Sequence, residues 1–413
     1  MSRFERVSVI GLGYIGLPTS AVFADNGVEV IGVDVNAAAV DGINAGRPHF
    51  IEPELDVLLR KVVERGKLRA TLVPEPADAF IVAVPTPFKD GFVPDLSYIE
   101  AAADAISPVL AKGNLLVLES TSPVGATEQF SKWLAERRPD LSFPHQAGEM
   151  SDIRVAHCPE RVLPGQILRE VVENDRVIGG ITRKCAQAAL SLYRIFVKGD
   201  CHLTDARSAE MAKLTENAFR DVNIAFANEL SLICDQLRIN VWELIRLANL
   251  HPRVNILRPG PGVGGHCIAV DPWFIVAGDP VNSRLIQTAR QVNNSKPDFV
   301  VQKVKAHCAT LKQPVVACLG LSYKANVDDM RESPAVEIVE HLARDNVAEL
   351  LLVEPHVNTL PKKLAAAGLK LWDFDRAIEQ ANILLLLVDH RSFLNVDRDV
   401  IKGKIVIDTC GAW

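Results

Sequence analysis

The segment RVSVIGLGYIGLPTSAVFADNGVEVIGVDVN, residues 6–36, decides the fold class. Apolar and β-branched residues over 7–10 are typical of a strand, and a glycine-rich turn follows them. A helical pattern then leads to a second strand pattern over 28–33, which ends at Asp34. A strand, a helix and a second strand joined by short turns predict a parallel βαβ unit.

The turn in this segment carries the spacing G-x-G-x-x-G, formed by Gly11, Gly13 and Gly16. The first glycine permits a tight turn, the second lets a pyrophosphate approach the backbone, and the third lets the helix pack against the strand. Asp34 is placed to accept hydrogen bonds from both hydroxyls of a ribose, and its charge would repel a 2′-phosphate. We therefore expect NAD rather than NADP as the cofactor. The alternative is a glycine turn in an α/β domain that binds no nucleotide.

The alternation of strands and helices recurs along the chain, with one helical region between its two parts. Further strand patterns lie at 80–84 and 115–118, and the region 205–249 has apolar residues at helical spacing. Residues 208–237 contain neither proline nor glycine, which predicts one long helix. From Pro314 onward, four more strand patterns appear: PVVACLGLSY, AELLLVEP, ANILLLLVDH and GKIVIDT.

These patterns predict an α/β fold with two Rossmann-like parallel-sheet domains joined by a long central helix. We expect a NAD-binding Rossmann domain at 1–200 and a central helical and dimerisation domain, with a catalytic loop, at 201–300. A C-terminal Rossmann-like domain is expected at 301–413. Its first strand leads to Gly320 without a G-x-G-x-x-G spacing, so we expect this domain to bind something other than a dinucleotide.

Composition sets limits on the function. The chain has 413 residues, 48% of them hydrophobic, and a formal net charge of −6, which gives no global preference for nucleic acid. The start resembles no signal peptide, and the longest apolar runs, such as 383–388, are too short to span a bilayer. We therefore expect a cytoplasmic protein with no membrane or nucleic-acid partner, whose eight cysteines are thiols. The two His-Cys pairs at 157–158 and 266–267 have no usual metal-ligand spacing, so no metal site is expected.

A second glycine-rich stretch, GPGVGGHCIAVDP at 260–272, surrounds Cys267 and is followed by Asp271. Glycines at this density indicate a backbone that bends sharply or that another group approaches closely. Beside NAD, a thiolate can add to an aldehyde formed by a first oxidation, lose a second hydride and leave a thioester for water to cleave. Cys267 is thus a candidate nucleophile, with His266 and Lys213 as candidates to lower its pKa. The alternative is a buried structural cysteine.

Candidate helpers occur in three other segments. Lys213, Asn217 and Arg220 share one face of the expected long helix, where a Lys-Asn pair could hold an oxyanion; a solvated helix face is the alternative. Glu160 lies between two prolines and could activate the hydrolytic water, although a surface turn fits the spacing equally well. Three threonines follow strand patterns and could bond the cofactor or simply cap helices: Thr86, Thr121 and Thr127.

With these residues assembled, the chain resembles the UDP-glucose/GDP-mannose dehydrogenase family along its whole length. The motifs that carry the resemblance are GLGYIGLP, ESTSPVG, CPER, AEMAKLTENAFR, GPGVGGHC with the following Asp271, and SYKANVDDMRESP. The resemblance implies an NAD-dependent, four-electron oxidation of the C6 alcohol of a nucleotide sugar to a carboxylate. HPRVN, CPERVLPG and GGHCIAVDPWFIV are most similar to the subgroup that oxidises UDP-N-acetyl-D-mannosamine for polysaccharide biosynthesis.

The resemblance also implies a role for each matching residue. Cys267 would be the nucleophile, Lys213 with Asn217 would hold the oxyanion and move protons, Glu160 would serve hydrolysis, and Asp271 would support Lys213 and the water. NAD would contact, beyond the glycines, Tyr14, Ile15, Asp34, Thr86, Thr127 and Arg331. The UDP-sugar would contact, besides Lys213 and Asn217, Arg161, Val162, Arg220, His251, Arg253, Gly264, Tyr323 and Lys324. Without the family, a salt-bridged surface loop would explain Arg331 and Lys324. Arg253 of relatives can reach across a dimer interface, so a homodimer built on the central helix is implied.

One departure and three alternatives stay open. Cys410 stands where this subgroup would carry a basic residue, so a UDP contact or a contact across the subunits is missing or replaced. The substrate could instead be UDP-glucose or UDP-N-acetylglucosamine. A two-electron dehydrogenase of the hydroxyacid type would need no cysteine. A regulator that binds nucleotides without turnover is the third alternative.

Overall fold

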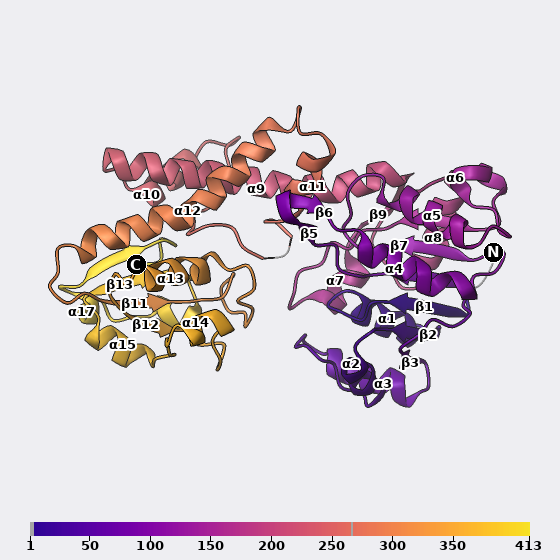
Figure 1. Cartoon of the computed structure of the whole chain (residues 1–413), viewed down its shortest axis with the longest axis horizontal. Coiled ribbons are helices and arrows are strands. Elements are labelled where there is room, and N and C mark those ends of the chain that lie inside the picture. Colours follow the sequence, from indigo (N-terminus) through magenta and orange to yellow (C-terminus); the bar gives the residue numbers. More distant parts are fainter. Residues whose placement is uncertain (1–3, 266) are drawn as a thin grey trace. The chain divides into compact units, whose positions relative to one another are not determined.

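The computed structural model describes residues 4–265 and 267–413, and the chain divides into two compact units. The first unit comprises Met1–Glu216 and Trp273–Asp279, and the second comprises Asn217–Pro272 and Pro280–Trp413. Each unit contains one main sheet with helices around it (Figure 1). The α/β class with two Rossmann-like sheets, predicted from the sequence, is confirmed.

The first unit is built on an eight-stranded sheet with the order β10-β9-β8-β7-β4-β1-β2-β3. Its strands are β1 (Arg6–Ile10), β2 (Glu29–Val33), β3 (Leu68–Thr71), β4 (Ala79–Val82), β7 (Leu115–Leu118), β8 (Arg154–His157), β9 (Arg176–Gly180) and β10 (Cys201–Asp205). All pairings are parallel except β8 with β9, which is antiparallel. The sequence predicted β1, β2, β4 and β7; it did not single out β8, β9 and β10.

Helices cover both faces of this sheet because successive strand residues point to opposite sides. In β4, Ala79 and Ile81 belong to one buried cluster, whereas Phe80 and Val82 belong to the other. The helices of the first unit are α1 (Gly16–Asp25), α2 (Ala37–Asn44), α3 (Leu55–Glu64), α4 (Ser97–Ile106), α5 (Ala126–Arg137), α6 (Pro144–Ala147), α7 (Ile167–Glu173) and α8 (Arg183–Tyr193). A two-stranded hairpin, β5 (Phe88–Lys89) with β6 (Val93–Pro94), follows β4. Both faces of the strands are therefore buried, as the continuous apolar strand patterns indicate.

The second unit contains a smaller parallel sheet with the order β12-β11-β13-β14. The strands are β11 (Val315–Leu319), β12 (Glu349–Val353), β13 (Ile383–Leu386) and β14 (Ile405–Asp408), all four of them predicted from the sequence. The helices after β11 are α13 (Pro334–Arg344), α14 (Lys362–Ala366), α15 (Phe374–Gln380), α16 (Arg391–Leu394) and α17 (Arg398–Ile401). Buried clusters lie on both faces of this sheet too.

The long helix predicted from the sequence is α9 (Ala206–Leu237), which begins in the first unit and ends in the second. It ends because Arg238 has a left-handed backbone conformation, with φ 58°, and Asn240 then caps a new helix, α10 (Val241–Ala248). Two further helices complete this region, α11 (Asp271–Gly278) and α12 (Arg284–Cys308). Among the helices of the described residues, none is both long and apolar enough to cross a membrane.

Candidate functional site

The loop between β1 and α1 has the geometry that the glycine spacing predicts. Gly11 has φ 91°, and a Cβ there would lie 2.5 Å from the carbonyl oxygen of Ala83. A Cβ on Gly16 would lie 1.8 Å from the carbonyl oxygen of Gly11. At Gly13 no atom lies within 4 Å of such a Cβ, so the backbone is open to an approaching group. Two glycines thus close the turn and the middle one leaves room for a pyrophosphate.

Asp34 lies at the end of β2 beside this loop. One carboxylate oxygen accepts a hydrogen bond from the backbone N–H of Leu12 at 2.9 Å, and the other accepts one from that of Asn36, also at 2.9 Å. Because each carboxylate oxygen has two lone pairs, acceptor capacity remains for ribose hydroxyls. The residues fit the adenosine half of NAD. Next to Gly13, the ring of Tyr14 lies 4.3 Å from that of Phe50, and Ile15 precedes the first turn of α1.

The threonines near this site already have protein partners. The hydroxyl of Thr86 donates to the carbonyl of Thr121 at 2.5 Å. Thr127 is fully buried, and both its backbone N–H and its hydroxyl donate to Glu210, at 2.7 and 2.6 Å. Glu210 therefore ties α9 to the first turn of α5. Each hydroxyl oxygen can still accept a hydrogen bond, so the cofactor role of Thr86 and Thr127 stays a prediction.

The loop that carries Cys267 belongs to the second unit and leads directly into the first residues of α11. Cys267 is exposed, and its carbonyl accepts hydrogen bonds from the N–H groups of Val270 and Asp271 at 3.1 and 2.8 Å. Asp271 is buried, and one of its carboxylate oxygens accepts a hydrogen bond from the side-chain amide of Asn217 at 2.5 Å. The structure thus brings Asn217 and Asp271 together in the turn after Cys267. His266 lies outside the described residues.

The glycines before Cys267 allow close packing within the second unit. A Cβ on Gly264 would lie 2.3 Å from the carbonyl oxygen of Glu332, and one on Gly262 would lie 2.8 Å from the Pro334 side chain. Gly265, with φ 84°, lies against the Tyr323 ring. Close approach to the segment 323–334 is therefore what the glycines provide.

A buried polar network holds the start of this loop. The side chain of Asn228 on α9 accepts a hydrogen bond from the N–H of Gly260 at 2.9 Å and donates one to Asn293 at 2.8 Å. Asn293 in turn donates to Asp221 at 2.8 Å, and Arg290 donates to the same carboxylate at 2.6 Å. Because buried polar groups are costly to leave unpaired, this network fixes the loop on α9 and α12.

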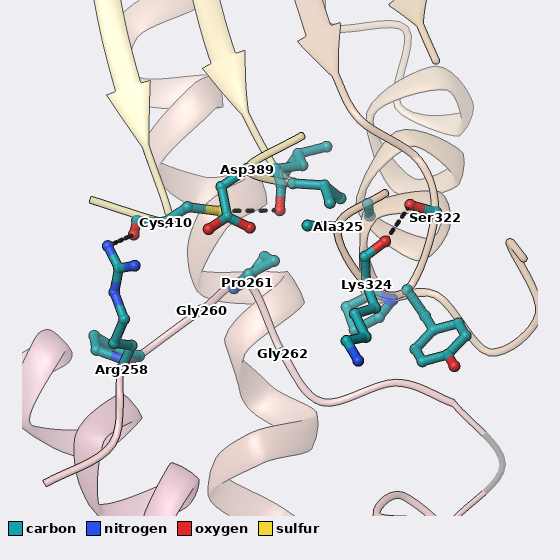
Figure 2. Close-up of a pocket in the computed structure, with 15 residues that line it drawn as sticks. Arg258, Gly260, Pro261, Gly262, Ser322, Lys324, Ala325, Asp389 and Cys410 are labelled. Atoms are coloured by element: carbon teal, nitrogen blue, oxygen red, sulfur yellow. Dashed lines mark hydrogen bonds between the residues drawn. The ribbon is translucent and has the colours of Figure 1, made fainter. Parts of the chain in front are cut away.

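A cavity of about 360 Å³ lies in the second unit, beside the same loop (Figure 2). Its lining includes the backbone of 259–262, the N-terminal residues of α13, and Lys324, Arg258, Asp389 and Cys410. Two cations and a helix N-terminus suit an anionic ligand. The guanidinium of Arg258 also donates to the carbonyls of Cys410 and Gly411, at 3.0 and 3.2 Å. Cys410 stands where a basic residue was expected, and the guanidinium of Arg258 places a positive charge beside it.

The Cys410 side chain acts as a neutral part of this cavity. Its thiol donates to the carbonyl of Leu387 at 3.2 Å, and burial raises the pKa of Cys410 to about 12. The thiol therefore stays protonated at neutral pH and adds no charge. Its carbonyl, rather than its side chain, contacts Arg258.

Glu160 lies in a buried cluster of charges in the first unit. One of its oxygens accepts a hydrogen bond from the N–H of Arg161 at 2.7 Å, and the other accepts one from Arg176 at 2.8 Å. Arg176 also lies 3.5 Å from Glu119, which accepts a hydrogen bond from the hydroxyl of Tyr193 at 3.0 Å. Burial raises the pKa of Glu119 to about 8, against the opposing charge of Arg176. Neither Arg176 nor Glu119 was assigned a role from the sequence.

The other residues predicted to bind substrate fall into both units. In the first unit, Val162 packs against the core, Lys213 is half-buried on α9, and Arg161 pairs with Glu216. In the second unit, Arg220, His251 and Arg253 are exposed, as a solvated face would be, and Tyr323 is half-buried. Arg331 forms a two-pronged ion pair with Asp329, at 2.9 and 2.7 Å, as the alternative of a salt-bridged surface loop expected. Among the described residues, no group of three or more His, Cys, Asp and Glu side chains is placed to hold a metal ion.

A dinucleotide loop, a cysteine on a glycine-rich loop and a separate cationic cavity together define a dehydrogenase that uses NAD and binds a second, anionic ligand. Three models of the UDP-glucose/GDP-mannose dehydrogenase family match consecutive parts of the chain: its NAD binding domain at 5–197, its central domain at 207–295 and its UDP binding domain at 317–413. The chain therefore belongs to the UDP-glucose/GDP-mannose dehydrogenase family. It is an NAD-dependent dehydrogenase of UDP-sugars.

Similar proteins include two bacterial enzymes. The NDP-N-acetyl-D-galactosaminuronic acid dehydrogenase of Ralstonia nicotianae is 63% identical over 410 residues, which cover 99% of this chain and 96% of that protein. The UDP-N-acetyl-D-mannosamine dehydrogenase of Campylobacter jejuni is 61% identical over 401 residues, which cover 97% of this chain and 98% of that protein.

A solved structure is similar to the whole chain. The UDP-D-ManNAc dehydrogenase of Pyrococcus horikoshii has a TM-score of 0.89 and 40% identity, covering 99% of this chain and 96% of that one. The likeness extends through both units.

Proposed function

We propose that the protein oxidises the C6 alcohol of UDP-N-acetyl-D-mannosamine to the carboxylate of UDP-N-acetyl-D-mannosaminuronate, with two NAD per sugar. The observation that carries this proposal is the exposed Cys267, with the buried Asn217–Asp271 pair in the next turn. A relative named for UDP-N-acetyl-D-mannosamine, 61% identical, supports the choice of sugar.

In the proposed reaction, bound NAD accepts the hydride in each of the two oxidations. Lys213 accepts the proton of the C6 hydroxyl in the first oxidation and, with Asn217, stabilises the oxyanion formed when the Cys267 thiolate adds to the aldehyde. The resulting thiohemiacetal loses the second hydride and becomes a thioester. Glu160 takes a proton from the water that cleaves the thioester, and Cys267 leaves as the thiolate. Asp271 keeps the amide of Asn217 oriented.

The remaining contacts are proposed on the fit of each residue. For NAD these are Gly11, Gly13, Tyr14, Ile15, Gly16, Asp34, Thr86, Thr127 and Arg331; for the UDP-sugar they are Arg161, Val162, Arg220, His251, Arg253, Gly264, Tyr323 and Lys324. The cavity beside Lys324 and Arg258 supports binding of the diphosphate, because its cations complement two phosphate charges. A reducing cytoplasm would suit the thiol chemistry of Cys267.

The test is the identification of the product by mass after incubation with NAD and UDP-N-acetyl-D-mannosamine. We expect the sugar acid and two NADH per sugar. One NADH with an aldehyde product would refute the four-electron reaction. Cys267→Ala should retain UDP affinity and form no acid; normal acid formation would remove the thioester step.

A second candidate substrate is UDP-N-acetyl-D-galactosamine. It is favoured by the 63% identity to the relative named for N-acetyl-D-galactosaminuronic acid. Measuring kcat/KM for the two sugars in parallel decides between them. Both sugars carry a 2-acetamido group.

We also propose a homodimer that uses α9. Phe219, Phe226 and Ile233 are spaced by seven residues on this helix and are 66%, 52% and 46% exposed. Such an apolar stripe on a helix is typical of a surface that another helix covers. Light scattering should give twice the chain mass, and Phe226→Glu should lower it; a monomeric wild type would contradict the proposal.

A further inference from the structure

The ion pair between Arg161 and Glu216 lies next to proposed catalytic residues in the sequence, and the proposed reaction gives the pair no role. Arg161 follows Glu160 directly, and Glu216 lies on α9 between Lys213 and Asn217. The Nε and Nη2 atoms of Arg161 contact the two carboxylate oxygens of Glu216 at 3.1 and 2.7 Å. This two-pronged geometry fixes the plane of the guanidinium as well as its position.

The backbone of Arg161 is held equally firmly. Its N–H donates to Glu160 at 2.7 Å, and its carbonyl accepts a hydrogen bond from the side chain of Asn174 at 3.2 Å. Within the described part of the chain, the third guanidinium nitrogen, Nη1, makes one long contact of 3.4 Å, to the carbonyl of Asp175. The side chain of Arg161 is 35% exposed, and because Nε and Nη2 are engaged by Glu216, we take Nη1 as the nitrogen that meets a ligand.

The charge of the pair decides what kind of ligand group suits it. Glu216 neutralises Arg161, so together they present no net charge to a ligand. A phosphate gains most from a cation that has no carboxylate partner, and the cavity of the second unit offers Lys324 and Arg258 for that purpose. A neutral acceptor such as an amide carbonyl gains from an oriented N–H donor without needing net charge.

We propose that Glu216 is a positioning residue that determines specificity. It neutralises Arg161 and aims Nη1 at the carbonyl oxygen of the 2-acetamido group of the sugar, which rests on the proposed function above. A 2-hydroxyl group is shorter and a weaker acceptor, so the donor is left poorly paired and that sugar is disfavoured. Buried or oriented polar groups discriminate strongly against analogues that leave them unpaired.

The experiment compares two substrates that differ only at C2, UDP-N-acetyl-D-mannosamine and UDP-D-mannose. Full-length wild type, Glu216→Gln and Glu216→Ala are assayed with both, and the ratio of the two kcat/KM values is determined. We expect the ratio to fall about tenfold or more in both variants, the cost of losing one oriented hydrogen bond. Glu75→Gln, which breaks the similar two-pronged pair with Arg69, is the matched control and should keep the ratio.

A second measurement separates orientation from general damage. Inorganic pyrophosphate should inhibit Glu216→Gln more strongly than wild type, by about threefold or more, because Arg161 then carries an uncompensated charge. Damage to the fold would weaken inhibition instead. Affinity for UDP, measured by calorimetry, reports on the intact second unit.

The outcomes distinguish the two proposals. An acetamido-selective wild type whose ratio is unchanged in both Glu216 variants overturns the role of Glu216 alone. Equal losses on both sugars, without tighter pyrophosphate inhibition, also overturn it. A wild type that prefers UDP-D-mannose refutes both this inference and the proposed substrate.

Discussion

The loops after the first strands of the two sheets share one backbone design and differ in what becomes of their acidic residue. Gly11 and Gly320 have φ 91° and 90°, and each donates its N–H at 2.8 Å to the carbonyl of the last residue of the neighbouring strand, Val33 or Val353. In both loops an acidic residue just after that strand accepts the next N–H: Asp34 from Leu12 and Glu354 from Leu321, at 2.9 and 2.7 Å.

The difference lies in the surroundings of the two carboxylates. Asp34 is partly exposed, and its hydrogen bonds with Leu12 and Asn36 both come from backbone N–H groups. Glu354 is buried and also accepts hydrogen bonds from the N–H of Ser322 at 3.0 Å and from His390 at 3.1 Å. Ser322 replaces the open second glycine. The first loop therefore keeps an acid for ribose, and the second uses its acid to hold its own backbone.

The largest expected effect comes from one glycine-to-alanine substitution in each loop, which should impair the binding of different ligands. Gly16→Ala should weaken NAD binding by a factor of 100 or more and leave UDP binding intact, because its Cβ would meet the Gly11 carbonyl at 1.8 Å. Gly320→Ala should do the reverse, since its Cβ would meet Val388 at 2.5 Å and its φ is positive. Calorimetric titration with NADH and UDP measures both. If Gly320→Ala lost NADH binding while Gly16→Ala retained it, the assignment of NAD to the first loop would be wrong.

Glu354→Gln tests whether the second acid is structural. Burial by itself would raise the pKa of Glu354, but the hydrogen bonds from His390 and Leu321 prevail and hold it below its usual value. The carboxylate is therefore bonded as an anion. Its replacement should lower the free energy of unfolding by about 2–3 kcal/mol. Urea unfolding measures this, with His356→Ala as a nearby control; a loss below about 0.5 kcal/mol would contradict a structural role.

Asp34→Asn, in contrast to Glu354→Gln, should change cofactor affinity rather than stability. One amide can still accept from Leu12 but holds two ribose hydroxyls less well, so NAD affinity should fall about tenfold, or 1.4 kcal/mol. Affinity for NADP should improve relative to NAD because the repulsion of a 2′-phosphate is removed. Fluorescence titration with NADH and NADPH measures both. An unchanged preference between the cofactors would remove Asp34 from cofactor choice.

The sequence predicted the first loop well because its determinants are local. Gly11, Gly13 and Gly16 fall within one turn, and Asp34 follows the neighbouring strand, so spacing alone brings them together. The strands of the second sheet were predicted for the same reason, from short, continuous apolar runs. β10 was missed because its residues are polar or partly exposed, as at an edge strand.

The pairings between distant residues could not be predicted in this way. Arg161 and Glu216 are 55 positions apart, and Asn228 and Gly260 are 32 apart, so only the folded chain shows that they meet. Glu160 was singled out between its prolines, but its buried partner Arg176 has no local signal. The roles assigned to the site residues depend on this tertiary packing and stay predictions until tested.

The smallest expected effect is a difference in pH dependence between the two buried acids. Glu119 in the first unit has its pKa raised by burial from 4.5 to about 8, whereas the pKa of Glu354 in the second unit is lowered. The stability linked to protonated Glu119 is complete below pH 4.5 and is lost as the pH rises through 8. Glu354 acts in the opposite direction, because its contribution is lost as the pH falls below 4.5.

Between pH 7 and 8 the difference between the wild type and Glu119→Gln comes from Glu119, because Lys296, whose pKa burial lowers to about 8, is common to both proteins. His157, whose pKa is lowered by burial to about 3, changes stability only below pH 6.5. From pH 7 to 8 the wild type should lose roughly 1 kcal/mol of unfolding free energy more than Glu119→Gln, since over this interval the folded state still holds most of a proton that the unfolded state has already released. Urea unfolding of both proteins at each pH measures the difference. If the unfolding free energies of the two proteins changed equally with pH, Glu119 would already be ionised beside Arg176. The predicted contrast between the two buried acids would then be wrong.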